Sequence, residues 1–245
     1  MIKLIALDVD GVIVDSAHEV FVVCQKALEE RGEILDDSYE EKFMRGRNFL
    51  RTAKDFYGII KLKDKDFDSM SQEYFNDYVN DHEEESRKMS EDFFAMRKKM
   101  QDEDYDKWFS LNRVYPGIAD AIKNLSKKFS IVISSTKDFY SIYTFLERVR
   151  IDISRENIIS KEISENKVDQ VKIISERFAA NFNEIFFIDD NPEQVKAVKK
   201  LGVNVALAGW GYTNERQKQE VREEGITILE KPGEIEKEIK RVNEE

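Results

Sequence analysis

The stretch Leu4–Ser16, LIALDVDGVIVDS, contains the first buried strand that the sequence predicts. Its apolar run leads into Asp8 and Asp10, with one valine between them, and Gly11 follows at once. Residues i and i+2 of a strand point to the same side, so both carboxylates face the same way. Like charges at the end of a buried strand repel each other unless a proton or a cation lies between them. This stretch therefore predicts a functional strand end.

Short apolar runs recur in the C-terminal half of the chain. They lie at residues 129–135, 184–190, 203–209 and 226–229, and they do not alternate with polar residues. This pattern is typical of strands that are covered on both faces, as in a parallel sheet. Helical patterns separate the runs, and Pro192 fits the first turn of one of these helices. The sequence therefore predicts an α/β fold with a doubly wound, mostly parallel sheet.

Residues 16–112 break this alternation. Apolar residues recur there at helical spacing, for example at intervals of four, three and four along 89–100, and no strand-like run appears. We therefore expect an inserted all-α domain, a helical cap, over residues 16–112. Residues 1–15 and 113–245 are expected to form the catalytic core.

Composition excludes several classes of protein. The chain has 245 residues, of which 41% are hydrophobic, which is enough to bury a substantial core. Its net charge of −11 argues against general affinity for nucleic acid or anionic membranes. Cys24 is the single cysteine and has apolar neighbours at helical spacing, which favours core packing and a reducing compartment. With neither a secretory signal nor a run of roughly 20 apolar residues, we expect a soluble cytoplasmic protein, monomeric or homodimeric.

Polar side chains follow the predicted strands where functional groups collect in parallel sheets, at the carboxyl ends. The run at 129–135 ends in Ser134 and Ser135, and the run at 184–190 ends in Asp189 and Asp190. Lys167 lies at the expected start of the helix before the second of these runs. If the strands are neighbours, four carboxylates, a hydroxyl group and an ammonium group converge on one crevice.

This convergence requires that some of the carboxylates are protonated or that a cation lies among them, and we favour the cation. Two carboxylates about 6 Å apart repel each other by roughly 3 kcal/mol at an effective dielectric constant near 20. A site made of oxygen ligands suits Mg²⁺, whereas a structural zinc ion would need cysteine or histidine, and both histidines lie in the insertion. The residues predicted to hold Mg²⁺ are Asp8, Asp10, Asp189 and Asp190.

A simpler interpretation exists for each residue taken singly. An aspartate at a strand end is more often a helix cap or a turn former, and Asp15 and Asp138 are assigned to that class. The run Trp210-Gly211-Tyr212 is interpreted mainly as packing and a turn, with contact near the site as the alternative. The joint occurrence of DVDG, SSTK, Lys167 and IDDNP at successive strand ends is much harder to explain without a function.

Four motifs resemble those of the haloacid dehalogenase (HAD) superfamily, in its phosphatase branch. They are DVDGVIVDS, the YPG of residues 115–117, SSTK and FFIDDNP. The stretch from Ala206 onward is similar to the end of phosphoglycolate-phosphatase-like members, and residues 16–112 resemble their helical C1-type cap in position. The resemblance implies a HAD-like Rossmannoid core and an Mg²⁺-dependent phosphomonoesterase that acts on a small phosphorylated metabolite.

The resemblance also implies roles for individual residues. Asp8 would be the nucleophile that forms an aspartyl-phosphate, and Asp10 would protonate the leaving oxygen and later activate water. Ser135 would bind a phosphoryl oxygen, and Lys167 would neutralise the developing charge. The residues expected to contact substrate also include Gly11 and Thr136. Independently of the resemblance, Arg45 and Arg47 around Gly46 are candidates for binding a second anionic group of the substrate, with a solvated turn as the interpretation that the sequence favours.

Several alternatives remain open at this point. Ser134 can replace Ser135, and Lys161 can replace Lys167. Gln194 stands where the family often has a further acidic residue, so metal binding would depend on the adjacent aspartates. A phosphomutase of the β-phosphoglucomutase type is the second hypothesis, and a phospho-accepting signalling receiver is a distant third. Asp10 argues against C–halogen chemistry, because the dehalogenase branch lacks this aspartate.

Overall fold

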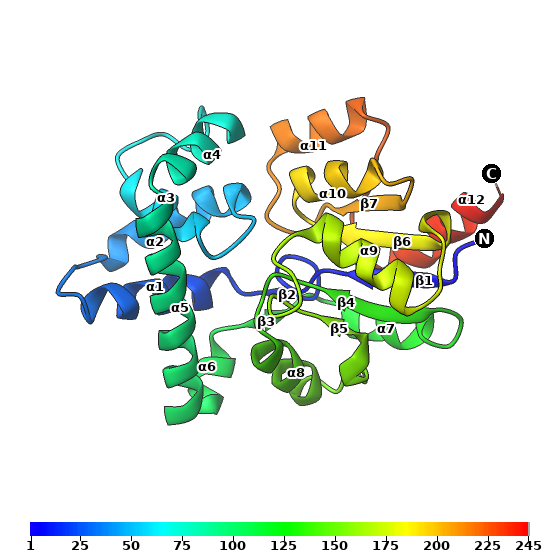
Figure 1. Ribbon diagram of the computed structural model, residues 1–245, viewed down its shortest axis with the longest axis horizontal. Helices are drawn as coiled ribbons and strands as arrows, with labels where there is room; N and C mark the ends of the chain where they lie inside the picture. The colour runs from blue at the N-terminus through cyan, green and yellow to red at the C-terminus, as the bar shows by residue number, and fades with distance from the viewer. Residues whose placement is uncertain (245) are drawn as a thin grey trace. The chain divides into compact units, whose positions relative to one another are not determined.

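The computed structural model, which describes residues 1–244, contains a six-stranded sheet whose strands are all parallel (Figure 1). The strands are β1 (Leu4–Leu7), β4 (Ser130–Ser134), β5 (Ile158–Ile159), β6 (Ile185–Asp189), β7 (Asn204–Ala208) and β8 (Thr227–Leu229). Their order in the sheet is β5-β4-β1-β6-β7-β8. Leu7 pairs with Ile133 on one side and with Ile188 on the other, so β4, β1 and β6 end at the same edge.

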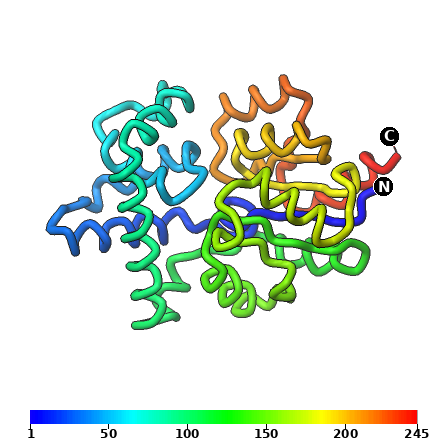
Figure 2. Tube along the Cα trace, in the orientation of Figure 1, coloured from blue at the N-terminus to red at the C-terminus, as the bar shows by residue number. Residues whose placement is uncertain are grey.

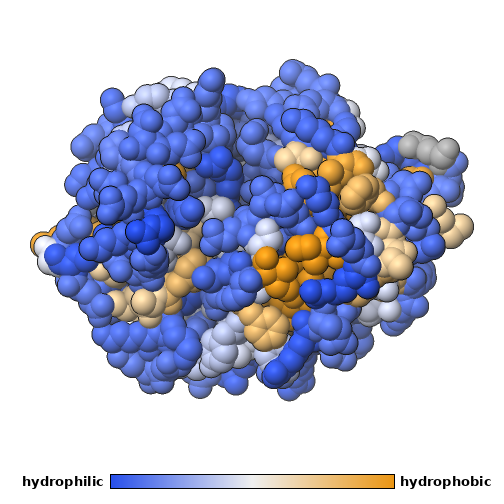
Figure 3. All heavy atoms as spheres, viewed as in Figure 1, coloured by the Kyte–Doolittle hydropathy of each residue, from blue (hydrophilic) through white to orange (hydrophobic). Residues whose placement is uncertain are grey.

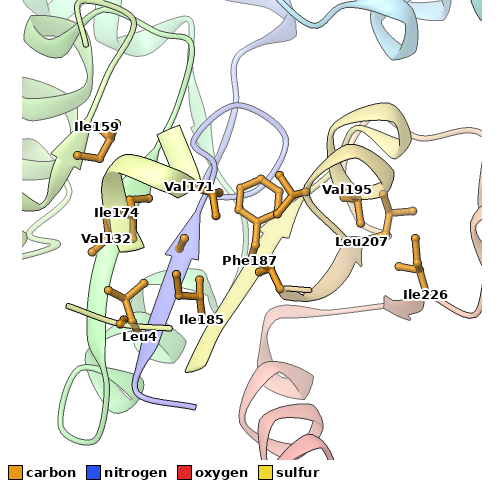
Figure 4. Packing of buried hydrophobic residues seen from close by; sticks show 14 of the residues in the cluster. Leu4, Val132, Ile159, Val171, Ile174, Ile185, Phe187, Val195, Leu207 and Ile226 are labelled. Carbon is orange, nitrogen blue, oxygen red and sulfur yellow. The ribbon is translucent and has the colours of Figure 1, made fainter. Parts of the chain in front are cut away.

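Helices cover the sheet because its strands are apolar on both faces. Phe187 of β6 lies among Val171 and Val195, which belong to helices on one face (Figure 4). The alternate residues Ile5 and Phe186 are equally buried, as expected for a sheet covered on both faces. The helices of this part are α7 (Ile118–Leu125), α8 (Phe139–Arg148), α9 (Lys167–Arg177), α10 (Pro192–Lys199), α11 (Glu215–Glu223) and α12 (Ile235–Glu244), with short 3₁₀ helices η3 (Arg155–Asn157), η4 (Phe182–Glu184) and η5 (Pro232–Glu234).

The chain divides into two units by its internal contacts. One unit consists of Met1–Asp15 and the chain from Val114 onward, and the other is Ser16–Arg113. The two ends of the described chain lie side by side in the first unit, where the Ile2 amide donates to Asn243 Oδ1 at 2.6 Å (Figure 2). The second unit contains α1 (Ala17–Glu29), η1 (Asp37–Tyr39), α2 (Glu40–Gly46), η2 (Arg47–Phe49), α3 (Asp55–Lys61), α4 (Gln72–Asp81), α5 (Glu83–Glu103) and α6 (Tyr105–Ser110). The short strands β2 (Val14–Asp15) and β3 (Arg113–Val114) form a separate pair.

A buried ion pair joins three helices of the second unit. The Arg97 guanidinium donates to both carboxylate oxygens of Glu19, at 2.8 and 2.9 Å, and Trp108 Nε1 donates to Glu19 Oε1 at 2.8 Å. Both charged residues are almost completely buried, and Arg97 also lies over the ring of Phe93. Such a pair requires good geometry on both sides, because a buried charge without its partner is costly. It therefore favours one arrangement of α1, α5 and α6.

The predicted fold class is confirmed: the sheet is parallel, helices flank it, and a helical segment is inserted after β1. The pattern of apolar runs does not predict β5, which has only two residues.

Most of the visible surface is hydrophilic, in agreement with a content of 36% charged residues (Figure 3). None of the helices in residues 1–244 combines the length and the apolar character needed to cross a bilayer.

Candidate active site

Three aspartates gather at the carboxyl ends of β1 and β6. Asp8 directly follows β1, Asp189 is the last residue of β6, and Asp190 comes next. One carboxylate oxygen from each lies within 4.8 Å of the other two, and all three residues are buried. The register causes this arrangement, because Leu7 and Ile188 are paired neighbours in adjacent strands. Three of the four aspartates predicted to bind a cation therefore lie together.

The ammonium group of Lys167 lies between two of these carboxylates. Its Nζ is 2.7 Å from Asp8 Oδ1 and 3.2 Å from Asp189 Oδ2, and it also donates to the Ser134 carbonyl. Lys167 is the first residue of α9, whose N-cap Asn166 accepts a hydrogen bond from a backbone amide in the first turn. The cap begins the helix at Lys167 and so determines where this side chain leaves the backbone.

Burial and charge act together on the pKa values of this group. Burial raises the pKa of Asp8 to about 6; the Lys167 ammonium opposes this rise, and the charges of Asp189 and Asp10 add to it. For Lys167, burial favours the neutral amine, but the carboxylates of Asp8 and Asp189 outweigh it and raise the pKa above its usual value. Lys167 is therefore charged at neutral pH, and one ammonium group faces three carboxylates.

The donor set fits a divalent cation. Asp189 Oδ2 is buried, and among residues 1–244 its one ion-pair partner is the Lys167 ammonium at 3.2 Å, while Asp189 Oδ1 accepts the Asn191 amide at 2.9 Å. Asp190 Oδ2 accepts the Tyr212 amide at 2.8 Å, which orients this carboxylate as well. Oxygen donors alone, with a negative charge that one lysine does not balance, suit Mg²⁺. Asp8, Asp189 and Asp190 are the residues that could hold it.

Asp10 lies outside this group of three and has a different partner. Its Oδ1 is 3.0 Å from Nζ of Lys137, a lysine whose side chain is almost completely buried. Lys137 is the last residue of the SSTK motif, and the sequence alone predicts no role for it. The signal was its position three residues after the end of β4, where a lysine can turn back to the neighbouring strand end. The assignment of Asp10 as a cation ligand stays a prediction.

The glycine and hydroxyl residues of the predicted site lie around the same strand ends. Gly11 has φ +83°, and a Cβ there would stand 2.1 Å from Asp190 Oδ2, so only glycine fits. The Ser134 hydroxyl donates to Gln170 at 2.7 Å, whereas the Ser135 hydroxyl accepts the Lys137 amide at 3.3 Å. Thr136 lies between the two serines and Lys137 in the sequence and is half-buried.

The two predicted substrate-binding arginines belong to the second unit. Arg45 lies in the last turn of α2, with its guanidinium 2.7 Å from Glu41 Oε1 and 3.8 Å from Asp68 Oδ2, and its side chain is 57% exposed. Arg47 begins η2 and is half-buried. A contact of either arginine with substrate stays a prediction.

The segment around Tyr212 is predicted as packing and a turn, with contact near the site as the alternative, and in the structure it contacts Asp190 and the turn after β1. The Tyr212 amide donates a hydrogen bond to Asp190, as described above, and the Tyr212 hydroxyl donates to Asp15 Oδ1 at 3.0 Å. Trp210 Nε1 donates to the Val12 carbonyl at 3.1 Å. No local pattern distinguishes these contacts, because GWGY is also an ordinary turn sequence.

Comparisons with known proteins concern the family and the fold of the chain. The model of the haloacid dehalogenase-like hydrolase family matches residues 2–202. A predicted phosphatase from Clostridium acetobutylicum has a similar structure, with a TM-score of 0.70, 15% identity, and coverage of 98% of this chain and 99% of the other. For a predicted phosphoglycolate phosphatase from Haemophilus somnus the TM-score is 0.64, with 15% identity and coverage of 96% and 97%. A haloacid dehalogenase-like family protein from Streptococcus pneumoniae gives 0.65, with 15% identity and coverage of 97% and 98%. Among curated proteins there is no match.

Proposed function

Because the chain belongs to the haloacid dehalogenase-like hydrolase family, we propose that it is an Mg²⁺-dependent phosphomonoesterase. In this proposal it hydrolyses a small phosphorylated metabolite through an aspartyl-phosphate on Asp8. The observation that carries the proposal is the group formed by Asp8, Lys167, Asp189 and Asp190 at one sheet edge. It combines a nucleophile, a fixed positive charge and a set of oxygen ligands for a cation.

In this proposal each residue of the site has a chemical role that fits its surroundings. The Asp8 carboxylate attacks phosphorus, and the charged Lys167 beside it stabilises the negative charge that develops on the phosphoryl oxygens. Asp10 protonates the leaving oxygen and then takes a proton from the water that hydrolyses the intermediate. The Ser135 hydroxyl supplies a hydrogen bond to a phosphoryl oxygen.

Mg²⁺ held by Asp8, Asp189 and Asp190 would supply further neutralisation of phosphoryl charge. It would also relieve the repulsion among the three carboxylates, which Lys167 balances only in part. The substrate is expected to be small and anionic. A reducing compartment such as the cytoplasm is also part of the proposal. The single cysteine is free and buried, which fits such a compartment.

A phosphate-release assay over a panel of phosphorylated metabolites tests this function. We expect Mg²⁺-dependent release from at least one small phosphoester and from a generic aryl phosphate, with loss of release in excess EDTA. A sugar 1-phosphate in the same panel tests for a mutase, because transfer gives the 6-phosphate instead of free phosphate. Absence of turnover on every substrate, with Mg²⁺ present and the protein folded, would refute the proposal.

Lys137→Met is expected to lower kcat by about tenfold to a hundredfold with a smaller effect on KM. The reason is that its ammonium group holds the Asp10 carboxylate at 3.0 Å, and proton transfer requires a fixed geometry. Steady-state kinetics on the best substrate measure the change, and Lys137→Arg should recover part of the rate. Lys172→Met removes an exposed lysine of α9 as a control. A kcat unchanged in Lys137→Met would show that this contact has no role in turnover.

Arg45→Ala is expected to raise KM for a substrate with a second anionic group and to leave kcat nearly unchanged. The exposed guanidinium already pairs with carboxylates, so an anionic substrate group can compete for it. Initial rates over a range of substrate concentration measure KM, with Arg87→Ala, an exposed arginine of α5 paired with Glu91, as the control. If KM stays within twofold of wild type, as a rough limit of significance, Arg45 does not bind substrate.

A further inference from the structure

The loop between β7 and α11, residues 209–213, contacts Asp190 through three consecutive residues. Gly211 packs against the Asp190 side chain, and the Tyr212 amide donates to Asp190 Oδ2 at 2.8 Å. The Thr213 hydroxyl donates to the Asp190 backbone carbonyl. The loop therefore contacts both the carboxylate and the backbone of Asp190. The loop follows β7, whereas Asp190 follows the neighbouring strand β6.

The same loop also holds the turn that follows the nucleophile strand. Trp210 Nε1 donates to the Val12 carbonyl at 3.1 Å, and the Tyr212 hydroxyl donates to Asp15 Oδ1 at 3.0 Å. Tyr212 thus bonds to Asp190 with its backbone and to Asp15 with its side chain. Movement of Asp190 and movement of the 11–15 turn are linked through one residue.

Gly211 is required at its position by this close packing. A Cβ on Gly211 would stand 2.4 Å from Asp190 Cβ, 2.5 Å from the Gly11 carbonyl oxygen and 2.6 Å from Asp190 Oδ2. Distances below 3.0 Å force something to shift, and two of these three atoms belong to Asp190. Any side chain at position 211 therefore displaces the loop, Asp190 or the Gly11 turn.

We infer that the 209–213 loop is the positioning element of the cation site, with Tyr212 as the positioning residue for the Asp190 carboxylate. The inference rests on the proposed function, because it requires that Asp190 binds Mg²⁺. Groups that orient metal ligands from behind typically change metal affinity by about tenfold to a hundredfold when they are removed. Here the orienting group is the backbone amide of Tyr212, which a side-chain substitution at 212 does not remove, so a substitution at the closely packed Gly211 is the sharper test.

The test compares Gly211→Ala with Gly209→Ala, a substitution two residues away in the same loop. A Cβ at Gly209 would stand 2.7 Å from Ile228 Cγ2 and 2.9 Å from the Leu229 carbonyl oxygen, so it is crowded but away from Asp190. Titration calorimetry with Mg²⁺ alone gives the dissociation constant of each protein. We expect Gly211→Ala to bind Mg²⁺ at least about tenfold more weakly than wild type, and Gly209→Ala to bind within about twofold while losing thermal stability.

A second measurement uses the wild-type protein, in case Gly211→Ala does not fold. Backbone amide NMR with and without saturating Mg²⁺ follows the amides of Tyr212 and Asn191, which donate to Asp190 and Asp189. We expect both amide signals to shift together as Mg²⁺ binds. A shift of Asn191 without any shift of Tyr212 would overturn the inference.

The outcomes separate this inference from the proposed function. If wild type binds Mg²⁺ and Gly211→Ala binds it equally well, the loop does not position the ligand and the proposed function is unaffected. Equal weakening in Gly209→Ala and Gly211→Ala would also overturn the inference, because the effect would then come from general loss of stability. If wild type binds no Mg²⁺ in either measurement, the inference and the metal dependence of the proposed function fail together.

Discussion

Asp8→Asn is expected to lower phosphate release by about 10⁴-fold or more, because an amide cannot replace the attacking carboxylate. The residue stands at the end of β1, 2.7 Å from the Lys167 ammonium, and no other group in the proposed mechanism can form the covalent intermediate. The measurement is kcat on the best substrate of the panel. Asp169→Asn, an exposed carboxylate on α9, serves as the control.

A companion variant separates the two carboxylates of the first strand. Asp10→Asn keeps the nucleophile, so it should still form the phosphoenzyme from an aryl phosphate, whose leaving group needs little protonation. Mass spectrometry of the quenched protein detects the added phosphoryl group. If Asp8→Asn keeps more than a tenth of the wild-type rate in the folded state, a barrier increase of less than about 1.4 kcal/mol, Asp8 is not the nucleophile.

Asp8→Asn is also expected to be more stable than wild type when Mg²⁺ is absent. Asp8 has a pKa of about 6 in the folded protein and 3.8 as its ordinary value, so the folded state binds the proton more tightly. Ionisation of Asp8 therefore lowers stability as pH rises from about 4 to about 6, and the loss is complete above that window. Because each pKa unit corresponds to about 1.4 kcal/mol, the loss is on the order of 3 kcal/mol.

Urea unfolding in EDTA measures this effect, at about pH 8 and at about pH 4. Asn carries no charge, so Asp8→Asn should exceed wild type in free energy of unfolding at the higher pH, with a difference that shrinks at the lower pH. Saturating Mg²⁺ should stabilise wild type more than the variant. A variant less stable than wild type at both pH values would contradict the unfavourable burial of this charge.

Lys167→Met is expected to have the opposite effect on stability, with a large loss of turnover as well. Methionine fills much of the same space but leaves Asp8 and Asp189 without their shared ammonium group. Removal of one partner from a buried pair costs about 3–5 kcal/mol. Loss of a fixed charge that stabilises the transition state costs about 10²–10³ in kcat.

The pH dependence of the stability loss in Lys167→Met follows from the charges of Lys167 and its carboxylate partners. The pKa of Lys167 is raised in the fold, so its contribution to stability is present at neutral pH and is lost only where lysine itself titrates. The destabilisation of Lys167→Met should therefore be largest at about pH 8 and smaller at about pH 4, where Asp8 is protonated and no longer pairs with the ammonium group. Lys172→Met, an exposed lysine on the same helix, should change stability by less than about 1 kcal/mol. Equal stabilities of Lys167→Met and wild type in EDTA at the higher pH would show that the ammonium group does not balance the carboxylates.

The site could be predicted in part because its main residues stand at the ends of regular elements. Asp8 and Asp189 close β1 and β6, and Lys167 opens α9, positions that local apolar patterns and cap residues define. The Lys137 contact with Asp10 was missed because Lys137 stands inside the loop after β4 and not at the end of a strand or the start of a helix. A lysine after a serine pair has many possible partners until the neighbouring strand is known.

The sequence by itself determined the class of fold, the place of the helical insertion after the first strand, and the acidic strand ends. These are consequences of short-range periodicity, since the alternation of buried strands and amphipathic helices repeats within a few residues. The tertiary structure alone decided that β4 and β6 flank β1, that Lys137 meets Asp10, and that the 209–213 loop holds Asp190. Those features depend on which distant segments pack together, and packing is set by the whole core and not by any local pattern.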